Sequence, residues 1–239
     1  MRRFIDLHLK APAGDVNELE GMLRFAADFG YSGVAVTPDG TNLRLREICL
    51  EKGLELISRV DLRPRSSNEL KTSLRRVRRR FEVVAVECRT KTVARQAAKD
   101  HRVDLLGFSP SPSIRGTVRF DRQEANLASG SNCAYEVNAS DIFNLTPSAC
   151  AKLLSTIRWE IENARRHGVS VVISSGADSR LLMREPRGLA SLLDLVGVSE
   201  EEGLDMISTI PWEIVESNRL KLSPMFVAPG VRVVDGDAR

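Results

Sequence analysis

Arginine side chains dominate the chemistry open to this sequence of 239 residues. Of its 35 basic residues 28 are arginines, and a planar guanidinium matches pairs of phosphate oxygens. A bias in base composition or adaptation to heat would produce the same excess, so the distribution of charge is more informative. Residues 59–80 carry nine basic side chains against Asp61 and Glu69, whereas residues 199–216 carry six acidic and no basic ones. This polarity predicts a basic face for nucleic acid and an acidic patch for another partner.

Side chains suited to nucleophilic or metal catalysis are sparse. The sequence has no Gly-x-Ser-x-Gly motif and no Cys-x-x-Cys pair, so we expect no catalytic residue, no metal and no cofactor. The N-terminal residues lack the apolar stretch of a secretory signal, and no apolar run approaches the ~20 residues that a membrane-spanning helix needs. The cysteines are widely spaced and fit a reducing cytoplasm, with two of them in apolar, strand-like runs: Cys49, Cys88, Cys133 and Cys150.

Seven short apolar runs are the predicted strands of the protein. They read as near-continuous apolar stretches, which is typical of parallel strands buried on both faces. They cover residues 4–9, 33–37, 54–60, 83–88, 104–108, 133–137 and 169–174. Amphipathic helices are predicted between them, with capping pairs at Asp15 and Glu18, Ser66 and Glu69, and Ser199 and Glu202, and with Pro147 and Pro186 in first turns.

Strict alternation of strands and helices leaves an open doubly wound sheet or a closed barrel. No Gly-x-Gly-x-x-Gly motif follows the first strand, which argues against the nucleotide-binding open sheet. We therefore predict an α/β fold: a distorted TIM-like β/α barrel with about seven parallel strands, as an eighth is missing or weak. The barrel domain is expected over residues 1–222, followed by a loosely ordered tail over 223–239 with a stray strand at 231–234.

The loops that follow the strands of such barrels hold the functional groups. Cations dominate these loops and carboxylates are few, which suits a polyanion better than carboxylate or magnesium chemistry. The candidate nucleic-acid contacts are Lys10, Arg63, Arg65, Arg89, Lys91, Arg115, Arg180, Arg184 and Arg187. We expect Arg63, Arg89, Arg115, Arg184 and Arg187 to converge on one rim. The candidate contacts for a protein partner are Glu200, Glu201, Glu202 and Asp205 in an acidic helix over 199–216.

Two further features have competing interpretations. Ser174-Ser175-Gly176 would form either an anion-binding nest of backbone N–H groups or an ordinary turn. The five arginines among residues 75–80 surround Val77 of an apolar stripe, so we interpret them as a solvated helix face.

The first predicted strand ends in Asp6-Leu7-His8-Leu9-Lys10. Its Asp-x-His pattern resembles the opening metal motif of the polymerase and histidinol phosphatase superfamily, which builds a metal cluster in a seven-stranded barrel. The superfamily pattern continues with a second histidine, where this sequence has Lys10, and an ammonium group has no lone pair to offer a metal. The other histidines, His101 and His167, fall on or just after helices. We therefore interpret His8 as a hydrogen-bonded barrel residue.

Four segments together resemble the thirty-kilodalton protein subunit family of archaeal and eukaryotic ribonuclease P. They are Phe4-Ile5-Asp6-Leu7-His8, Ile173-Ser174-Ser175-Gly176-Ala177, Arg184-Glu185-Pro186-Arg187, and Pro211-Trp212-Glu213-Ile214-Val215-Glu216-Ser217-Asn218-Arg219. The resemblance extends from the first strand to about Leu222 and rests on the order and spacing of these segments.

The resemblance implies a barrel of the polymerase and histidinol phosphatase type that has lost its metal site. It also implies a non-catalytic subunit, because the RNA subunit removes the 5′ leader of precursor tRNA in that family. The implied partners are ribonuclease P RNA, precursor tRNA through the complex, and a smaller α/β protein subunit. The arginines would then neutralise phosphates that approach one another when RNA compacts.

Two other functions compete with this interpretation. A metal-dependent phosphoesterase of the same superfamily would use Asp6 and His8 with Asp39 or Asp61, although the shortage of histidines argues against it. A protein scaffold would use the acidic segment 199–216 as its main surface, with the arginines incidental. Metal analysis separates the first alternative from an RNA-binding subunit, and salt-dependent RNA binding separates the second.

Overall fold

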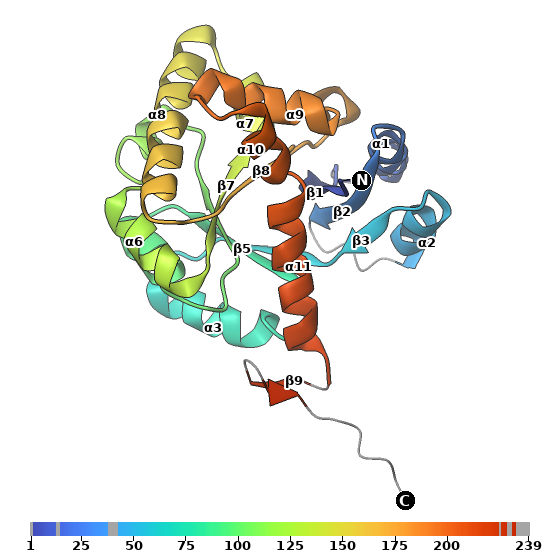
Figure 1. The fold of residues 1–239 in the computed structure, drawn as a ribbon, viewed down its shortest axis with the longest axis horizontal. Helices are drawn as coiled ribbons and strands as arrows, with labels where there is room; N and C mark the ends of the chain where they lie inside the picture. The colour runs from blue at the N-terminus through green and yellow to red at the C-terminus, as the bar shows by residue number, and fades with distance from the viewer. Residues whose placement is uncertain (1, 13–14, 38–42, 225, 229–230, 233–239) are drawn as a thin grey trace, which may run out of the picture.

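Apolar strands alternate with amphipathic helices along the chain, as the sequence predicts (Figure 1). The computed structural model describes residues 2–12, 15–37, 43–224, 226–228 and 231–232. Six of the seven predicted strands are confirmed, and the third is divided into two strands. The strands are β1 Phe4–Lys10, β2 Tyr31–Thr37, β3 Glu55–Ile57, β4 Arg59–Leu62, β5 Val83–Cys88, β6 Leu105–Phe108, β7 Ala134–Asn138, β8 Val171–Ser174, β9 Phe226–Ala228 and β10 Val231–Arg232.

The strands pair in parallel in two sheets, with the orders β1-β2-β3 and β4-β5-β6-β7-β8. The prediction of one strand over 54–60 is wrong because the chain changes sheet at Ser58. The amide and hydroxyl groups of Ser58 donate to Glu82 Oε2 at 2.6 and 2.8 Å. A side-chain carboxylate thus satisfies the backbone N–H at the point where the strand pairing changes.

A stretch of backbone between two helices closes the barrel where β1 and β8 approach each other. The amide of Ile5 in β1 donates to Ile207 O at 3.0 Å, and the amide of Ile173 in β8 donates to Met206 O at 3.1 Å. At the other end of the same junction Lys10 N donates to Ala177 O at 2.7 Å. Non-strand backbone therefore supplies the hydrogen bonds that an eighth strand would make, and the predicted seven-stranded, distorted barrel is confirmed.

The helices surround the strands and begin largely where the capping residues predict (Figure 1). Asp15 accepts the amide of Glu18 at 2.9 Å, and Ser66 accepts that of Glu69 at 3.2 Å. The helices are α1 Val16–Asp28, α2 Leu43–Glu51, α3 Ser67–Val77, α4 Lys91–Ala98, α5 Pro112–Arg115, α6 Arg122–Ser131, α7 Ser140–Phe143, α8 Pro147–Arg166, α9 Pro186–Leu192, α10 Glu200–Asp205 and α11 Thr209–Leu222, with 3₁₀ turns η1 Arg180–Leu182 and η2 Leu193–Val196.

The interior of the barrel is apolar at the end where the strands begin. Ile5, Leu7, Val83, Leu105 and Val172 form this cluster with neighbouring strand residues. Helix α11 completes it with Trp212 and Val215, and Figure 1 shows α11 running beside the strands. A second, larger core lies between the strands and the surrounding helices. Because α11 covers the strand beginnings, polar groups inside the barrel are directed to the other end, the mouth.

Two predictions about the C-terminal third need qualification. The acidic segment 199–216 is not one helix, because α10 ends at Asp205 and the backbone of Met206 and Ile207 is used in barrel closure. After α11, β9 and β10 form an antiparallel pair, and the rest of the strand predicted over 231–234 lies outside the described residues. No helix in the described ranges combines the length and apolarity needed to span a membrane.

Candidate functional site

A bulge in β1 brings His8 into the barrel mouth. Asp6 pairs with Val34 and Leu9 with Val36, so β1 has one residue more than β2 over this interval. His8 Nδ1 lies 2.8 Å from Asn138 Oδ1, and Nε2 lies 3.1 Å from Asp61 Oδ2. The interpretation of His8 as a hydrogen-bonded barrel residue is therefore confirmed.

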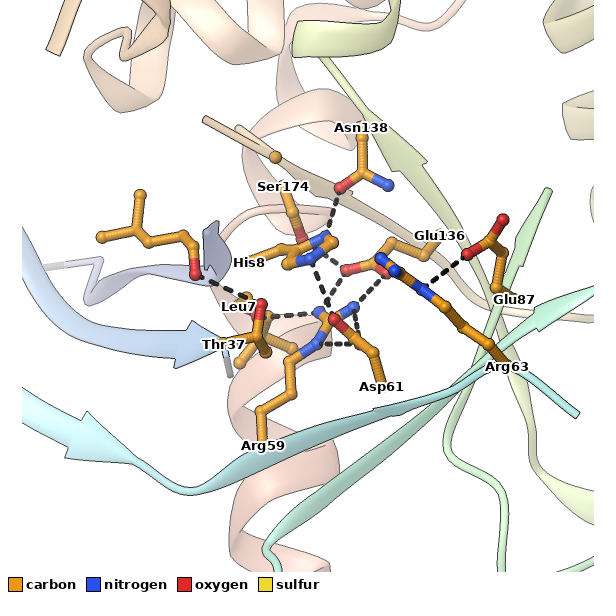
Figure 2. A network of polar contacts seen from close by, with 12 residues as sticks. Leu7, His8, Thr37, Arg59, Asp61, Arg63, Glu87, Glu136, Asn138 and Ser174 are labelled. Carbon is orange, nitrogen blue, oxygen red and sulfur yellow. Dashed lines mark hydrogen bonds and ion pairs between the residues drawn. The ribbon is translucent and has the colours of Figure 1, made fainter. Parts of the chain in front are cut away.

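Arg59 of β4 occupies the centre of the mouth with 1 % of its surface exposed (Figure 2). Its Nη1 and Nη2 donate to Glu136 Oε1 and Oε2 at 2.6 and 2.7 Å. Its Nε donates to Asp61 Oδ1 at 2.9 Å, and Nη1 also reaches Leu7 O at 2.7 Å. Ser174 Oγ donates to Glu136 at 2.7 Å. The guanidinium thus has carboxylate partners on two strands, which a buried charge requires.

The electrostatics of this cluster favour fully ionised carboxylates. Burial disfavours the charged form of Asp61, but the charge of Arg59 and the hydrogen bond from His8 outweigh it and hold the pKa of Asp61 far below its usual range. Glu136 is buried too, and Arg59 lowers its pKa by the same attraction. The pair of carboxylates and the guanidinium therefore form a permanent internal ion-pair network.

The mouth does not fit the metal cluster of the superfamily that the first strand resembles. The carboxylates of Asp61 and Glu136 face a guanidinium, and Lys10 offers no lone pair. Asp6 is directed elsewhere, since its Oδ1 accepts the amides of His8 and Ser175 at 3.1 and 3.0 Å. Within the described ranges no group of three or more His, Cys, Asp or Glu side chains could hold a metal ion. Asp39 lies outside the described residues.

Three of the predicted cations line a pocket of about 270 Å³ at the mouth: Lys10, Arg63 and Arg89. Arg63 and Arg89 are exposed and share one carboxylate, with their Nε atoms 2.9 and 2.8 Å from the two oxygens of Glu87. Asp141 also lines this pocket, and burial raises its pKa. The expectation of few carboxylates at this face is wrong, because the strands themselves contribute Asp61, Glu87 and Glu136.

The other predicted cations lie apart from this pocket. Arg180 pairs with Glu18 of α1 at 2.8 Å, and Arg187 approaches Glu200 of α10 at 3.3 Å. The guanidinium of Arg184 lies 4.4 Å from the ring centroid of Phe143. Lys91 pairs with Asp121 and Glu124, whereas Arg65 is exposed after β4. The five arginines expected on one rim are therefore not brought together around the pocket.

Arg115 is a buried structural residue, and its placement on the rim is wrong. Only 6 % of its surface is exposed. Its guanidinium pairs with Glu160 of α8 and donates to Tyr135 Oη at 2.6 Å and to Phe108 O at 2.9 Å. The short helix α5 folds this residue back beneath the loop that follows β6.

The arginines over 75–80 also include both exposed residues and a structural one. Arg75, Arg76, Arg79 and Arg80 are exposed, as expected of a solvated face. Arg78 is different, because it pairs with Asp104 and donates to the carbonyl oxygens of neighbouring residues. It is a structural residue at the base of the barrel.

The turn after β8 is not an open anion nest. The amide of Ser175 donates to Asp6, and that of Ala177 donates to Ser175 Oγ at 3.2 Å. Gly176 has φ +60°, and a Cβ there would lie 2.6 Å from Ser140 Oγ. The turn therefore requires glycine for a tight structural connection.

The acidic residues predicted to contact a protein are largely paired within the molecule. Glu200 approaches Arg187, Glu202 pairs with Arg165, and Asp205 pairs with Arg2. Glu201 is exposed and has no ion-pair partner in the described part of the chain.

The sequence interpretation missed Arg59, Glu136 and Asn138, which define the centre of the mouth. Their signal was present in the strands: a charged residue within an otherwise apolar run buried on both faces must have a partner of opposite charge. Arg59 and Glu136 are such a pair.

The fold and the site together define a seven-stranded β/α barrel whose mouth holds a buried guanidinium paired with carboxylates and exposed arginines at its edge. Residues 3–223 match the family model described as RNase P subunit p30. This match covers most of the chain, so the chain belongs to the ribonuclease P subunit p30 family, and the resemblance is confirmed.

Named relatives agree with this family. The ribonuclease P protein component 3 of Methanosarcina acetivorans is 27% identical over 238 residues, covering 98% of this chain and 97% of the relative. The ribonuclease P protein subunit p30 of Mus musculus is 26% identical over 235 residues, covering 87% of this chain and 83% of the relative. A chain in a cryo-EM structure of archaeal ribonuclease P with mature tRNA has the same fold, with a TM-score of 0.81 and 21% identity over 98% of this chain and all of that one (100%).

Proposed function

We propose that this chain is a non-catalytic, RNA-binding subunit of ribonuclease P that supports the catalytic RNA in removing the 5′ leader of precursor tRNA. The observation that carries the proposal is the barrel mouth. Exposed Arg63 and Arg89 and half-buried Lys10 line its pocket, and Arg59 at its centre neutralises the carboxylates of Asp61 and Glu136. Membership of the ribonuclease P family supplies the molecular context.

The proposed RNA face consists of Lys10, Arg63 and Arg89, with Arg65 two residues after Arg63. Arg180, Arg184, Arg187 and Lys91 remain candidate contacts outside the pocket. Arg63 and Arg89 both pair with Glu87 in the free protein, and phosphates of RNA would replace that carboxylate as their partner. Fixed cations then offset the repulsion between RNA strands that approach one another, which bulk salt would otherwise have to do.

The proposed partners are ribonuclease P RNA, precursor tRNA through the complex, and a smaller α/β protein subunit. We propose the exposed end of α10, with Glu200 and Glu201, as the contact for that subunit, because it would repel RNA and attract a basic protein surface. Reversing both to Lys should weaken co-purification with the smaller subunit and leave RNA affinity equal or higher. Weaker RNA binding with intact pairing would count against this assignment. We place the protein in the cytoplasm, where its four free cysteines stay reduced.

Reconstitution of tRNA 5′ processing with and without this chain tests the proposed function. We expect the chain to lower the magnesium concentration needed for cleavage, since fixed cations replace bulk ones. The isolated chain should hydrolyse neither precursor tRNA nor phosphomonoesters. Stoichiometric bound zinc or manganese, with hydrolysis abolished by His8→Ala, would instead establish the metal-dependent phosphoesterase.

A further inference from the structure

The two tryptophans of the chain have opposite environments. Trp212 is 7 % exposed, and its indole N–H donates to Arg3 O at 2.9 Å. Trp159 is 42 % exposed, although it lies in the middle of the long helix α8. It is outside the buried stripe of that helix, to which Ile157 and Ile161 belong. Tryptophan is enriched at interfaces, so an exposed indole on a rigid helix is a candidate contact for a ligand.

One arginine contacts the exposed indole, and a second lines the groove beside it. The guanidinium of Arg119 lies 4.6 Å from the ring centroid of Trp159, in cation–π contact. Arg158 directly precedes Trp159 in α8 and is exposed. A groove of about 430 Å³ runs between α8 and η2, and both Trp159 and Arg158 line it. Neither Arg119 nor Arg158 has an ion-pair partner among the residues that the structure describes.

The charge on the exposed face of α8 indicates which kind of ligand would bind next to Trp159. Its cations are Lys152, Arg158, Arg165 and Arg166, against one partly exposed carboxylate, Glu162, which lines the same groove. Arg166 neutralises Glu162 at 2.9 Å, and Arg165 is occupied by Glu202. The charge left over next to the indole is therefore positive, and it belongs to Arg119 and Arg158. An exposed indole with one guanidinium over its ring and a second lining the same groove is complementary to a base with its flanking phosphates.

We propose that Trp159, Arg119 and Arg158 form a stacking site for one unpaired nucleotide of RNA. The base stacks on the indole, and the guanidinium groups contact the adjacent phosphates. This site rests on the proposed RNA-binding function, but its physics differs from that of the barrel mouth. Stacking releases no counterions, so loss of the indole changes affinity without changing the salt dependence that the cations set.

Fluorescence titration of the full chain tests this site, because Trp159 is the exposed fluorophore and Trp212 serves as an internal reference for folding. The probes are a single-stranded RNA of about twelve nucleotides and a duplex of the same length. We expect the single strand to quench the emission and the duplex to leave it unchanged. Trp159→Leu should weaken binding of the single strand about tenfold at an unchanged salt slope, with Trp159→Phe recovering part of the loss. Leu50→Ala, at an exposed apolar residue of α2, is the matched control and should bind like the parent.

Binding of RNA with a normal salt slope but without quenching, or with equal quenching by the duplex, would overturn the stacking site and leave the proposed function standing. Quenching by the smaller protein subunit and not by RNA would reassign the surface to a protein contact. Failure of the chain to bind any RNA, alone or in the reconstituted complex, would overturn both.

Discussion

Glu87 restrains the two exposed arginines of the barrel mouth, and its removal should increase RNA affinity. In the free protein Arg63 and Arg89 each pair with one oxygen of Glu87. An exposed ion pair contributes little to stability, but its carboxylate competes with phosphate for both guanidinium groups. We expect Glu87→Gln to tighten RNA binding roughly two- to fivefold. Filter binding at fixed ionic strength measures the change.

The control for this prediction is Glu55→Gln, which removes a carboxylate that is likewise shared by two arginines, Arg3 and Arg219, at the base of the barrel. It should raise affinity less than Glu87→Gln. A Glu87→Gln variant that folds normally and binds RNA more weakly would mean that Glu87 orients the arginines rather than competing for them.

Arg115 should affect stability and not RNA affinity. Its removal leaves Glu160 buried without its cation, although Tyr135 Oη and the amide of Phe120 still donate to that carboxylate. We expect Arg115→Met to lower the free energy of unfolding by about 3 kcal/mol. Denaturant unfolding gives this value, and RNA affinity is then measured at a temperature where the variant is fully folded. If the variant were as stable as the parent and its RNA binding depended less on salt, Arg115 would be an RNA contact and the structural assignment would be wrong.

At the scale of single residues, local chemistry could be predicted and burial could not. The caps at Asp15 and Ser66 depend on side chains three residues apart, so the sequence contains the whole interaction. Whether an arginine after a strand meets solvent depends on the path of the loop. Pro112 begins a short helix after β6 that directs Arg115 inward to Glu160, which lies 45 residues away.

Among the elements, Arg59 connects three strands: its own β4, β7 through Glu136, and β1 through Leu7 O. Arg59→Met leaves the Glu136 carboxylate buried and without its main partner. We expect a loss of about 3–5 kcal/mol at neutral pH. Arg59→Met combined with Glu136→Gln should recover part of it, because no uncompensated charge remains next to β7.

The pH dependence of stability should distinguish the Arg59→Met variant from the parent. In the parent the pKa values of Asp61 and Glu136 lie below their ordinary values of 3.8 and 4.5. Their contribution is therefore present above those values and is lost as the pH falls through the lowered folded-state pKa. Without Arg59, burial should raise the pKa of Glu136, so the variant should become more stable relative to the parent as the pH falls from about 7 to about 5. Urea unfolding at both pH values measures this, and an unchanged difference would show that the guanidinium does not control Glu136.

The strands could be predicted as elements because buried parallel strands are short apolar runs. The break at Ser58 could not, since it depends on Glu82, a residue distant in sequence. The acidic segment also read as one helix because its charge pattern is continuous. Its interruption at Met206 and Ile207 follows from barrel closure, where β1 and β8 require those carbonyl groups.

At the scale of the whole molecule, one end of the barrel is closed by α11 and the other end is a polar mouth. Helix α11 covers the beginning of the barrel with Trp212 and Val215, and Arg78 and Asn218 both contact Asp104 beside it. At the other end Lys10, Arg63 and Arg89 meet solvent around the pocket. Fold class and strand number were predictable from the alternation of elements. The composition of the mouth was not, because it depends on which strand residues face inward.

The most direct test of the central claim is the salt dependence of affinity for ribonuclease P RNA, measured for two double variants. Arg63→Gln with Arg89→Gln removes the exposed arginines of the mouth, and Arg75→Gln with Arg79→Gln removes two exposed arginines of the helix cluster. We expect the mouth variant to lose about two units of slope in log affinity against log salt, and the helix variant to keep the parent slope. Circular dichroism must show both variants folded. The reverse result, a lost slope in the helix variant and an unchanged one in the mouth variant, would contradict the assignment of the barrel mouth as the RNA face.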